Sequence, residues 1–188
     1  MARYSKSHKE TSRQALLSAA ARLFRTNGFN GVGIDQLCAG AGLTRGAFYA
    51  HFRSKRALFE SVLQGPHDFI ERLLARKSGR VAEGAAKVAT DYLTPTNRTA
   101  VLGGCSLASL AMDTARGETK AQQAYADAVE KIVTEFKRDH PTLSDADARA
   151  ALALCVGGLL VSAACGESAS ADKIERAARQ QVETLLAV

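Results

Sequence analysis

The sequence predicts an all-α protein, with three short N-terminal helices followed by a larger helical domain. Apolar residues recur at spacings of three and four along most of the 188-residue chain, as on the buried face of an amphipathic helix. Ala is abundant and Trp is absent, which also favours helices. The sequence has no alternating apolar and polar run that would predict a strand. We expect one domain over residues 1–54 and a second over residues 55–188.

The first three expected helices share one small core. A capping box at residues 11–14 begins the first helix, which extends to about residue 27. The second helix ends at Gly42, a residue that tolerates the positive φ of a tight turn without a Cβ clash. Thr44 caps the third helix, and Phe48 faces inward from it. This arrangement is a helix, a turn and a second helix packed on a first one.

A fourth helix is expected from about Lys55, after a cap at Ser54. The pair Gly65-Pro66 interrupts its apolar pattern, which resumes at Ile70. Because proline lacks an N–H group and clashes with the preceding turn, we expect a kink or a break at this point.

The larger domain contains five further helical patterns. The expected helices span about 85–92, 105–115, 118–138, 144–165 and 171–187. An irregular stretch from Thr94-Pro95 to Gly104 separates the first two. The chain therefore reads as helical from end to end, with short connections.

The helix expected over 144–165 is unusual because residues 150–166 include no charged side chain. This stretch is short for a membrane span and contains Gly157-Gly158, so we expect no membrane and a helix buried on nearly every side. Together with the last helix it presents more apolar surface than one slim domain can cover. This favours a four-helix seam of a homodimer over a monomer core. The expected seam residues are Leu152, Val156, Leu159, Leu160, Ile174, Ala178, Val182 and Leu185.

The positive charge of the chain is concentrated in its first third. The whole chain has a net charge of +6, but residues 1–60 hold ten of the 25 Lys and Arg and only three of the 19 Asp and Glu. The remainder carries slightly more acidic than basic residues. A uniformly basic protein would adhere to any polyanion, whereas this asymmetry assigns the polyanion contact to one module.

The third helix presents residue types that suit DNA recognition. Its start, Thr44-Arg45-Gly46, offers a short side chain, a long cation and no side chain, so the helix end can approach base edges in a major groove. Tyr49, His51 and Lys55 lie further along and can donate to phosphate oxygens. An ordinary helical hairpin with exposed cations is the alternative reading.

The first 60 residues resemble the TetR family of bacterial transcriptional regulators in the identity and spacing of many residues. The matching positions are Ala20, Leu23, Phe24, Gly28, Ile34, Leu37, Ala41, Gly42, Leu43, Thr44, Gly46, Phe48, Tyr49, His51, Phe52, Ser54, Lys55 and Leu58. The resemblance implies an all-helical homodimer whose N-terminal modules bind a palindromic operator in double-stranded DNA and whose larger domain holds an inducer pocket. It also implies DNA contacts by Thr44, Arg45, Gly46, Tyr49, His51 and Lys55. Gly33 departs from the family, which has Thr or Ser there to cap the second helix and contact a phosphate.

Cys105 is the most reactive candidate among the four cysteines, whose spacing fits neither a metal site nor a secreted disulfide framework. It follows two glycines at an expected helix N-terminus, where backbone N–H groups can stabilise a thiolate. The segment is similar to a branch of the family whose members sense electrophiles through one cysteine. The alternative is a small buried apolar residue. Further candidates for the inducer pocket are Phe69, Tyr92, Met112 and Tyr125.

These observations predict a cytoplasmic, dimeric repressor that a small-molecule or electrophile inducer releases from its operator. No signal peptide is recognised, and no catalytic site, cofactor or metal is expected. Two alternatives stay open: a non-specific architectural DNA binder, and a small helical enzyme with Cys105 as its nucleophile. The enzyme would need a base near Cys105, and none of the four histidines is obviously paired with it.

Overall fold

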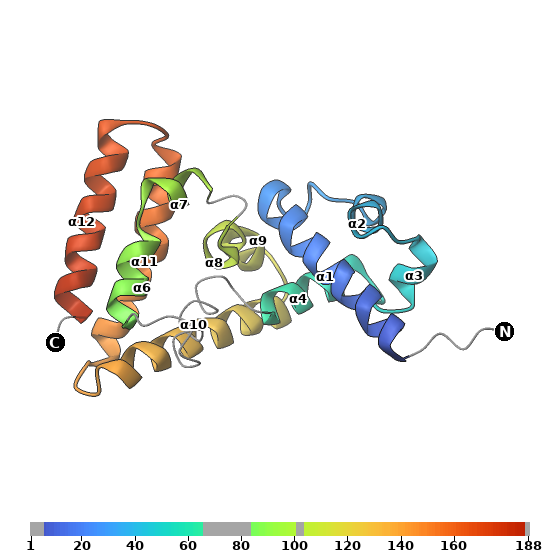
Figure 1. Ribbon diagram of the computed structural model, residues 1–188, viewed down its shortest axis with the longest axis horizontal. Helices are drawn as coiled ribbons and strands as arrows, with labels where there is room; N and C mark the ends of the chain where they lie inside the picture. Colours follow the sequence, from blue (N-terminus) through green and yellow to red (C-terminus); the bar gives the residue numbers. More distant parts are fainter. Residues whose placement is uncertain (1–5, 66–83, 101–103, 187–188) are drawn as a thin grey trace.

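The computed structural model describes residues 6–65, 84–100 and 104–186 of the chain. Every regular element in these ranges is a helix, which confirms the all-α prediction. The molecule is elongated, with the first three helices at one end and the last two at the other (Figure 1). We call the helical unit formed by residues 6–65 the head.

The head consists of α1 (Lys6–Asn27), α2 (Ile34–Ala41), α3 (Arg45–Tyr49) and α4 (Lys55–Gln64). Helix α1 begins before the capping box that the sequence suggested at 11–14. Residues 11–14 therefore lie inside the helix and do not form its start. Helix α4 ends at Gln64, and Gly65 after it is extended, so the helix stops where the sequence predicted a kink or a break. The pattern expected after the Gly65-Pro66 pair lies outside the described residues.

One apolar cluster holds the head together. Fully buried residues from three helices meet in it, including Leu16 of α1, Leu37 of α2 and Phe48 of α3. Aromatic rings continue the cluster towards α4, where the ring centroids of Phe24 and Phe59 lie 5.3 Å apart in an edge-to-face arrangement. Helix α4 thus packs with the three preceding helices. The expected boundary between residues 54 and 55 stays a prediction.

The remaining helices build a second unit. They are α6 (Ala85–Tyr92), α7 (Pro95–Thr99), α8 (Ser106–Ser109), α9 (Ala111–Ala115), α10 (Thr119–Asp139), α11 (Asp145–Ala164) and α12 (Ala169–Leu186). Two expectations were wrong here. The stretch expected to be irregular contains α7, and the single helix expected over 105–115 is divided into α8 and α9 at Leu110.

Helices α11 and α12 lie side by side as a pair, with α6 beside them (Figure 1). Gly158 permits the close approach, because a Cβ atom there would lie 2.8 Å from the Cβ of Ala178 and 3.1 Å from Leu93. The second apolar cluster lies between these helices and α10. The ring of Tyr125, on α10, packs against both apolar clusters and so joins the two units.

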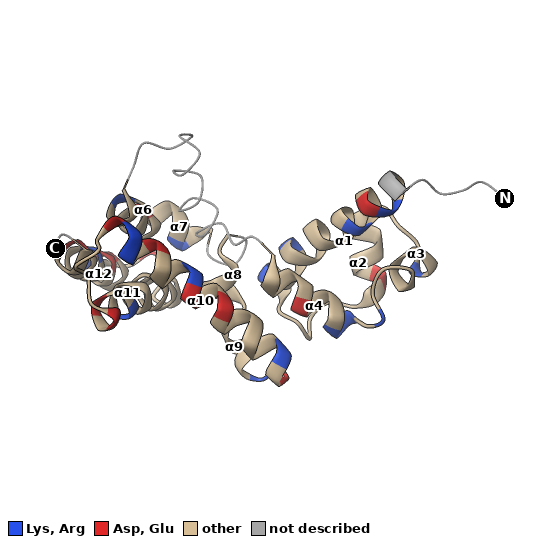
Figure 2. Cartoon of the chain, turned by 90° about the horizontal axis from the view of Figure 1, so that it is seen from below, with Lys and Arg blue, Asp and Glu red and all other residues tan. Residues whose placement is uncertain are grey.

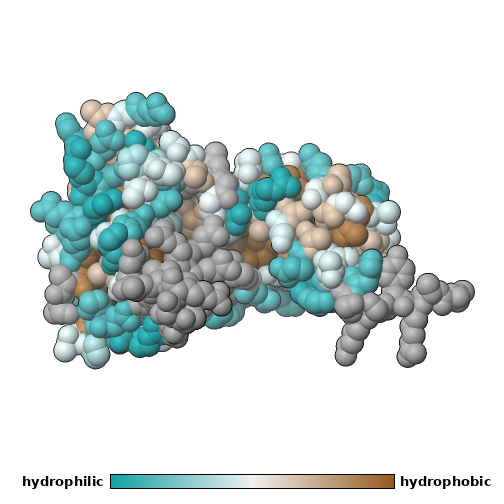
Figure 3. Space-filling model, viewed as in Figure 1, coloured by the Kyte–Doolittle hydropathy of each residue, from teal (hydrophilic) through white to brown (hydrophobic). Residues whose placement is uncertain are grey.

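Helix α11 is less buried in one protomer than the sequence suggested. It is long and apolar enough to cross a membrane, with a mean hydropathy of 1.5, yet only 33% of that window is buried within the protomer. Val161 on this helix is 52% exposed. The expectation that α11 is buried on nearly every side was therefore wrong for the single chain. On the face drawn in Figure 3, hydrophilic residues cover most of the α12 end, and apolar colour is confined to smaller areas.

Candidate nucleic-acid interface and regulatory site

The turn between α2 and α3 fixes the direction of α3. Gly42 adopts φ 65°, in the left-handed region, and its N–H donates to the carbonyl of Ala39. The hydroxyl of Thr44 accepts the N–H of Ala47 at 3.3 Å and caps α3. The buried ring of Phe48 then anchors the helix in the head core. Three consecutive local features therefore place the start of α3 on the surface.

The exposed side of α3 gathers most of the predicted DNA-contacting residues. Thr44, Arg45 and Gly46 are exposed, and Tyr49 is 57% exposed one turn later. A Cβ atom at Gly46 would meet only the hydroxyl of Thr44, at 3.8 Å, so open space surrounds this position. A flat surface such as a base edge can approach here. The predicted role of these residues stays a prediction.

The guanidinium group of Arg45 lies against the carboxylate of Asp35 on α2. Nη2 donates to Oδ2 at 2.7 Å, and Nε donates to Oδ1. Both side chains remain largely exposed, at 66% and 70%. The hydrogen bond that Arg45 donates to the Asp35 carboxylate raises the pKa of Arg45 above its usual value, so the cation is retained. This pair links the first turns of α2 and α3 on their solvent side.

His51 is bonded to α1. Its Nε2 atom lies 2.8 Å from the hydroxyl oxygen of Ser12. That hydroxyl lies within donating distance of the carbonyls of His8 and Lys9, so a donating Nε2–H of His51 satisfies both groups. Burial lowers the pKa of His51, and the charge of Lys9 lowers it further. The imidazole is therefore neutral at neutral pH.

Lys55 is bonded inside the head. Its Nζ donates to the carbonyl oxygens of Phe29 and Val32, each at 2.9 Å, and lies 4.3 Å from the centroid of the Phe29 ring. These bonds tie the start of α4 to the loop after α1. An ammonium group has three N–H donors, so a phosphate contact, which stays a prediction, would use the third.

Lys and Arg residues, blue in Figure 2, outnumber Asp and Glu in the head. Arg13 of α1 lies 5.4 Å from the centroid of the Phe52 ring, and Arg53 is exposed just before α4. Helix α2 lacks the side-chain cap that the family usually has, but the amide oxygen of Gln36 accepts the N–H of Gly33 at 2.7 Å. This bond satisfies the N–H of the N-cap residue without a hydroxyl group.

Helices α8 and α9 connect the head with the second unit. Oδ2 of Asp113 accepts the N–H of Phe29 at 2.9 Å, directly after the left-handed Gly28 that ends α1. Nη1 of Arg25 donates to the hydroxyl of Ser106 at 3.5 Å. Leu110, between α8 and α9, is fully buried in the head cluster. The position of the head therefore depends on these two short helices.

A polar hollow of about 550 Å³ separates α4 from the start of α10 on another side of this junction. Arg56 and Glu118 form an ion pair there, with Nε and Oε1 3.2 Å apart. Within the part of the chain that the structure describes, no group of His, Cys, Asp and Glu side chains could hold a metal ion. The exposed ion pair of Arg56 and Glu118 is therefore a further contact between the two units.

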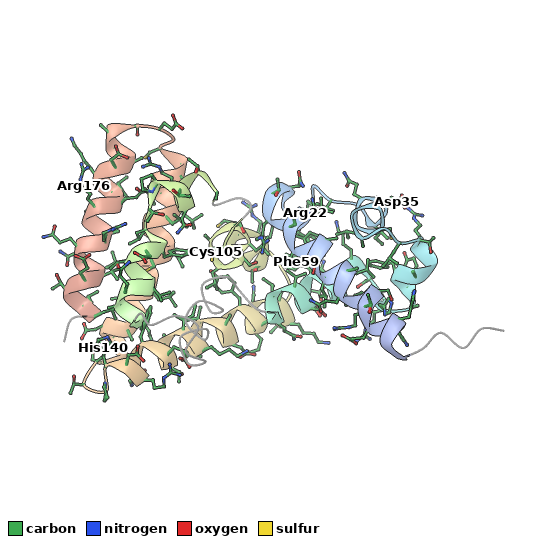
Figure 4. The ribbon with its side chains drawn as sticks, in the orientation of Figure 1. Arg22, Asp35, Phe59, Cys105, His140 and Arg176 are labelled. Carbon is green, nitrogen blue, oxygen red and sulfur yellow. The ribbon has the colours of Figure 1, made fainter. Side chains whose placement is uncertain are left out.

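Three of the predicted sensor residues come together in the second unit. Cys105 and Tyr92 are each 5% exposed. Burial raises the pKa of Tyr92, and the neighbouring Cys105 side chain raises it further. Burial also raises the pKa of Tyr125 to about 12, and its hydroxyl donates to the carbonyl of Leu107 at 2.6 Å. Cys105 lies near the middle of the molecule, between the head and α11 (Figure 4).

The two other sensor candidates lie elsewhere. Met112 is 60% exposed on α9, apart from the tyrosines, and Phe69 lies outside the described residues. Helix α8, which follows Cys105, contains four residues, so its dipole offers a thiolate less stabilisation than a long helix would. Cys38 and Cys155 are also buried, and burial raises the pKa of Cys155 to about 12, whereas Cys165 is exposed.

An apolar groove of about 300 Å³ opens beside Tyr125, between α8, α10 and α11. Its lining residues are Leu107, Tyr125, Val129, Arg149, Leu152, Ala153, Val156 and Gly157. The single charge among them, on Arg149, is neutralised by Glu130, with N–O distances of 2.7 and 3.0 Å. The volume is at the lower end of that of small-molecule sites. The groove can therefore hold a small, mainly apolar molecule.

The residues expected at a dimer seam fall into two groups. The first group is buried in the core of the single chain and consists of Leu152, Leu159, Ala178 and Val182. The second group is partly exposed and consists of Val156, Leu160, Ile174 and Leu185. The second group, together with the exposed Val161, forms the accessible apolar surface of the α11 and α12 pair. Only this group could contact a partner directly, and its role stays a prediction.

Sequence reasoning did not predict the contact of Asp35 with Arg45 or that of Asp113 with Phe29. Asp35 is separated from Arg45 by ten positions, and Asp113 from Phe29 by 84. A helix start that holds an acidic residue is common, so Asp35 carried no distinct signal. No sequence pattern connects Asp113 with the head.

Comparison with known proteins gives matches at two levels. Residues 16–62 match the profile of the family described as bacterial regulatory proteins, tetR family. Over 62 residues the chain is 39% identical to the HTH-type transcriptional regulator AcrR of Shigella flexneri, an alignment that covers 33% of this chain and 29% of the relative. Over 61 residues it is 36% identical to the HTH-type transcriptional repressor BepR of Brucella suis, covering 32% and 29%. The match thus spans about three tenths of the length of these curated relatives.

Solved structures are similar over nearly the whole chain. The reduced form of Escherichia coli NemR has a TM-score of 0.72 at 19% identity, covering 93% of this chain and 96% of that one. A transcriptional regulator of the TetR family from Cytophaga hutchinsonii also has a TM-score of 0.72, at 18% identity, with 98% of each chain covered. At these identities the likeness establishes a shared fold.

Proposed function

We propose that this chain, whose residues 16–62 belong to the tetR family of bacterial regulatory proteins, is a dimeric DNA-binding transcriptional regulator that a ligand releases from its operator. The observation that carries the proposal is the start of α3. There Arg45 stands exposed between a capping threonine and a glycine, on a helix fixed by a buried phenylalanine. Such a rigid, narrow helix end fits the major groove.

The roles of the interface residues follow from their positions. Thr44, Arg45 and Gly46 approach base edges, and Tyr49 donates to the phosphate backbone from the same exposed side. His51 and Lys55 contribute less directly, because each is bonded within the head. His51, a neutral imidazole with one N–H, gives that donor to Ser12 and holds α3 in place, whereas Lys55 ties down α4 and offers its third N–H to a phosphate.

The dimer supplies the second half-site contact. A helix with a mean hydropathy of 1.5 and only a third of its length buried leaves apolar surface that water would otherwise contact. A second copy of α11 and α12 would cover it in a four-helix seam, with Val156, Leu160 and Val161 against the partner. Twofold symmetry then requires a palindromic operator, with half-sites roughly 34 Å apart or somewhat more.

Ligand binding in the groove beside Tyr125 is the proposed release step. Tyr125 lines the groove, packs against both apolar clusters and donates to the carbonyl of Leu107 next to Cys105. A ligand that moves Tyr125 or α8 would shift Leu110 and Asp113, and with them the head. The ligand releases DNA only if it binds more tightly to the state whose heads are misplaced. We propose that a regulator released in this way acts as a repressor.

An electrophile that alkylates Cys105 is a second form of the same release step. The thiol lies among Tyr92, Tyr125 and Leu107, so an added group there would have to displace these neighbours. Burial of Cys105 limits access, which predicts slow modification compared with the exposed Cys165. Catalysis by Cys105 has less support, since His51 is bonded to Ser12 in the head and His140 lies at the far end of α10 (Figure 4).

The test compares the affinity of the purified protein for DNA upstream of its own coding sequence with its affinity for scrambled DNA of equal length. At physiological salt a specific regulator prefers the upstream DNA by about a thousandfold or more. Equal affinity for both DNAs would contradict the proposal and indicate an architectural binder.

The same assay, repeated after treatment with a thiol-reactive electrophile, assigns the sensor. Loss of binding in the wild type and in Cys165→Ser, but not in Cys105→Ser, would support Cys105 as the sensor. Loss in Cys105→Ser but not in Cys165→Ser would assign the effect to the exposed thiol. No loss in any variant would leave the groove as the site of a non-covalent inducer.

A further inference from the structure

Asp35 and Arg45 face each other across the turn between α2 and α3. Asp35 lies in the first turn of α2, and Arg45 is the first residue of α3. Figure 4 labels Asp35 at the end of the molecule remote from α11 and α12. Buried Leu37 and Phe48 fix the two helices on the head core, so the carboxylate and the guanidinium are held by rigid elements.

The geometry of the pair leaves the recognition edge of the arginine free. Arg45 donates to Asp35 through Nε and one N–H of Nη2. The end of the guanidinium, with two N–H groups on Nη1 and the second N–H on Nη2, is not used by this pair. One N–H from each Nη can therefore fork onto the O6 and N7 acceptors of guanine while the Asp35 contact persists.

Electrostatics favours the same arrangement. A helix dipole stabilises an acidic residue in the first turn, which suits Asp35, but offers no stabilisation to a cation at a helix start such as Arg45. The Asp35 carboxylate supplies the compensating charge. It also reduces the net charge of the pair, which weakens attraction to any phosphate and leaves the directional contact to a base.

We infer that Asp35 is a positioning residue for base recognition, which holds Arg45 in the orientation that forks onto one guanine of each half-site. The inference rests on the proposed DNA-binding function. In this scheme both Asp35 oxygens accept from Arg45, and Asp35 itself touches no base. Its effect is on the choice of sequence more than on total affinity.

The experiment selects bound DNA from a random pool with the full-length wild type, Asp35→Asn and Arg45→Ala, and then measures the affinity of each for selected and scrambled DNA. Arg45→Ala is expected to lower the preference for guanine at one position per half-site by about tenfold. Asp35→Asn should lower it at that same position by about two- to fivefold, the range for one exposed ion pair. Because a negative charge is lost, its affinity for scrambled DNA should rise.

A matched control is Glu130→Gln, which breaks an exposed two-point pair with Arg149 in the second unit. This variant should keep the wild-type sequence preference. Thermal unfolding of all variants shows whether the head is intact. If Asp35 had only a structural role, Asp35→Asn would lower the affinity for selected and for scrambled DNA together. A lower guanine preference with a higher affinity for scrambled DNA would exclude that explanation.

The results separate the two proposals. If the wild type selects no sequence, the proposed function fails. If the wild type selects a sequence and Asp35→Asn leaves the guanine preference unchanged or strengthens it, Asp35 does not position Arg45 and the inference is overturned. When Arg45→Ala is already present, adding Asp35→Asn should not change the guanine preference further. If Asp35→Asn changes that preference as much there as it does alone, the inference is also overturned.

Discussion

The hydrogen bond between Asp113 and the head provides a quantitative test of how the two units are joined. Oδ2 of Asp113 accepts the N–H of Phe29 at 2.9 Å, at the point where α1 ends in the left-handed Gly28. In Asp113→Ala this N–H loses its charged acceptor. A hydrogen bond to a charged group contributes about 1.5–3 kcal/mol, and partial exposure places this one near the lower value.

The expected loss of about 1.5 kcal/mol corresponds to a decrease in Tm of roughly 3–6 °C for a chain of this size. Urea unfolding measures the free energy, and thermal unfolding measures the Tm. Both are done at a fixed protein concentration, because dimerisation would make stability depend on concentration. Asp113→Asn, which keeps an acceptor oxygen without the charge, should lie between the wild type and Asp113→Ala.

Asp127→Ala is the matched control, since Asp127 accepts only an exposed hydrogen bond from Gln123 one turn away on α10. Its free energy of unfolding should stay within about 0.5 kcal/mol of the wild type. Equal stability of Asp113→Ala and Asp127→Ala would refute the reasoning, because the contact between the units would then contribute nothing measurable.

Three further variants test the packing, the titration and the capping of helices. Gly158→Ala should lower the free energy of unfolding by about 1–3 kcal/mol, because the new Cβ would lie 2.8 Å from that of Ala178. Gly157→Ala, whose new Cβ would have no atom of the described residues within 4 Å, should leave it unchanged or raise it; similar losses in both variants would contradict the packing. Because the pKa of His51 is lowered in the folded state, the free energy of unfolding should fall as pH decreases through about 6.5. His51→Gln should reduce this fall, measured by urea unfolding at pH 7.5 and 5.5. An equal fall in the variant and the wild type would contradict the role of His51. Ser54→Ala should lower stability by about 1 kcal/mol, because the Ser54 hydroxyl accepts an N–H at 3.1 Å at the start of α4; a loss below about 0.3 kcal/mol would contradict the cap.

Most helices could be predicted from the sequence because their ends are determined locally. Thr44, Ser54 and Ser144 each accept an N–H three residues later, as expected for capping residues. The turn glycine, Gly42, adopts the positive φ that its position suggested. Where the caps were strong, the expected and observed helix starts agree within one or two residues.

The two wrong expectations about residues 94–115 have physical reasons. Thr94-Pro95 was taken as the end of a helix, but proline is also well suited to the first position of one, and Thr94 caps α7 by accepting the N–H of Asn97. The break at Leu110 results from tertiary packing, since this residue is drawn into the head core between α8 and α9. Local sequence alone therefore determines neither the formation of α7 nor the break at Leu110.

The apolar periodicity identified buried faces but not their partners. It marked α11 as apolar, yet it did not distinguish the residues packed in the protomer, such as Leu152 and Leu159, from those left accessible, such as Leu160. Tyr125 and Cys105 were separate candidates in the sequence, which did not show that they are neighbours. Contacts between residues far apart in the chain, including that of Lys55 with Phe29, became visible only in the fold.

The most direct test of the central claim is the mass and affinity of the complex formed with DNA upstream of the protein's own coding sequence, measured together at about 150 mM salt. Sedimentation should give two chains on each palindromic site, and the affinity should exceed that for scrambled DNA by about a thousandfold. A single chain per site, or equal affinity for both DNAs, would contradict a dimeric, sequence-specific regulator.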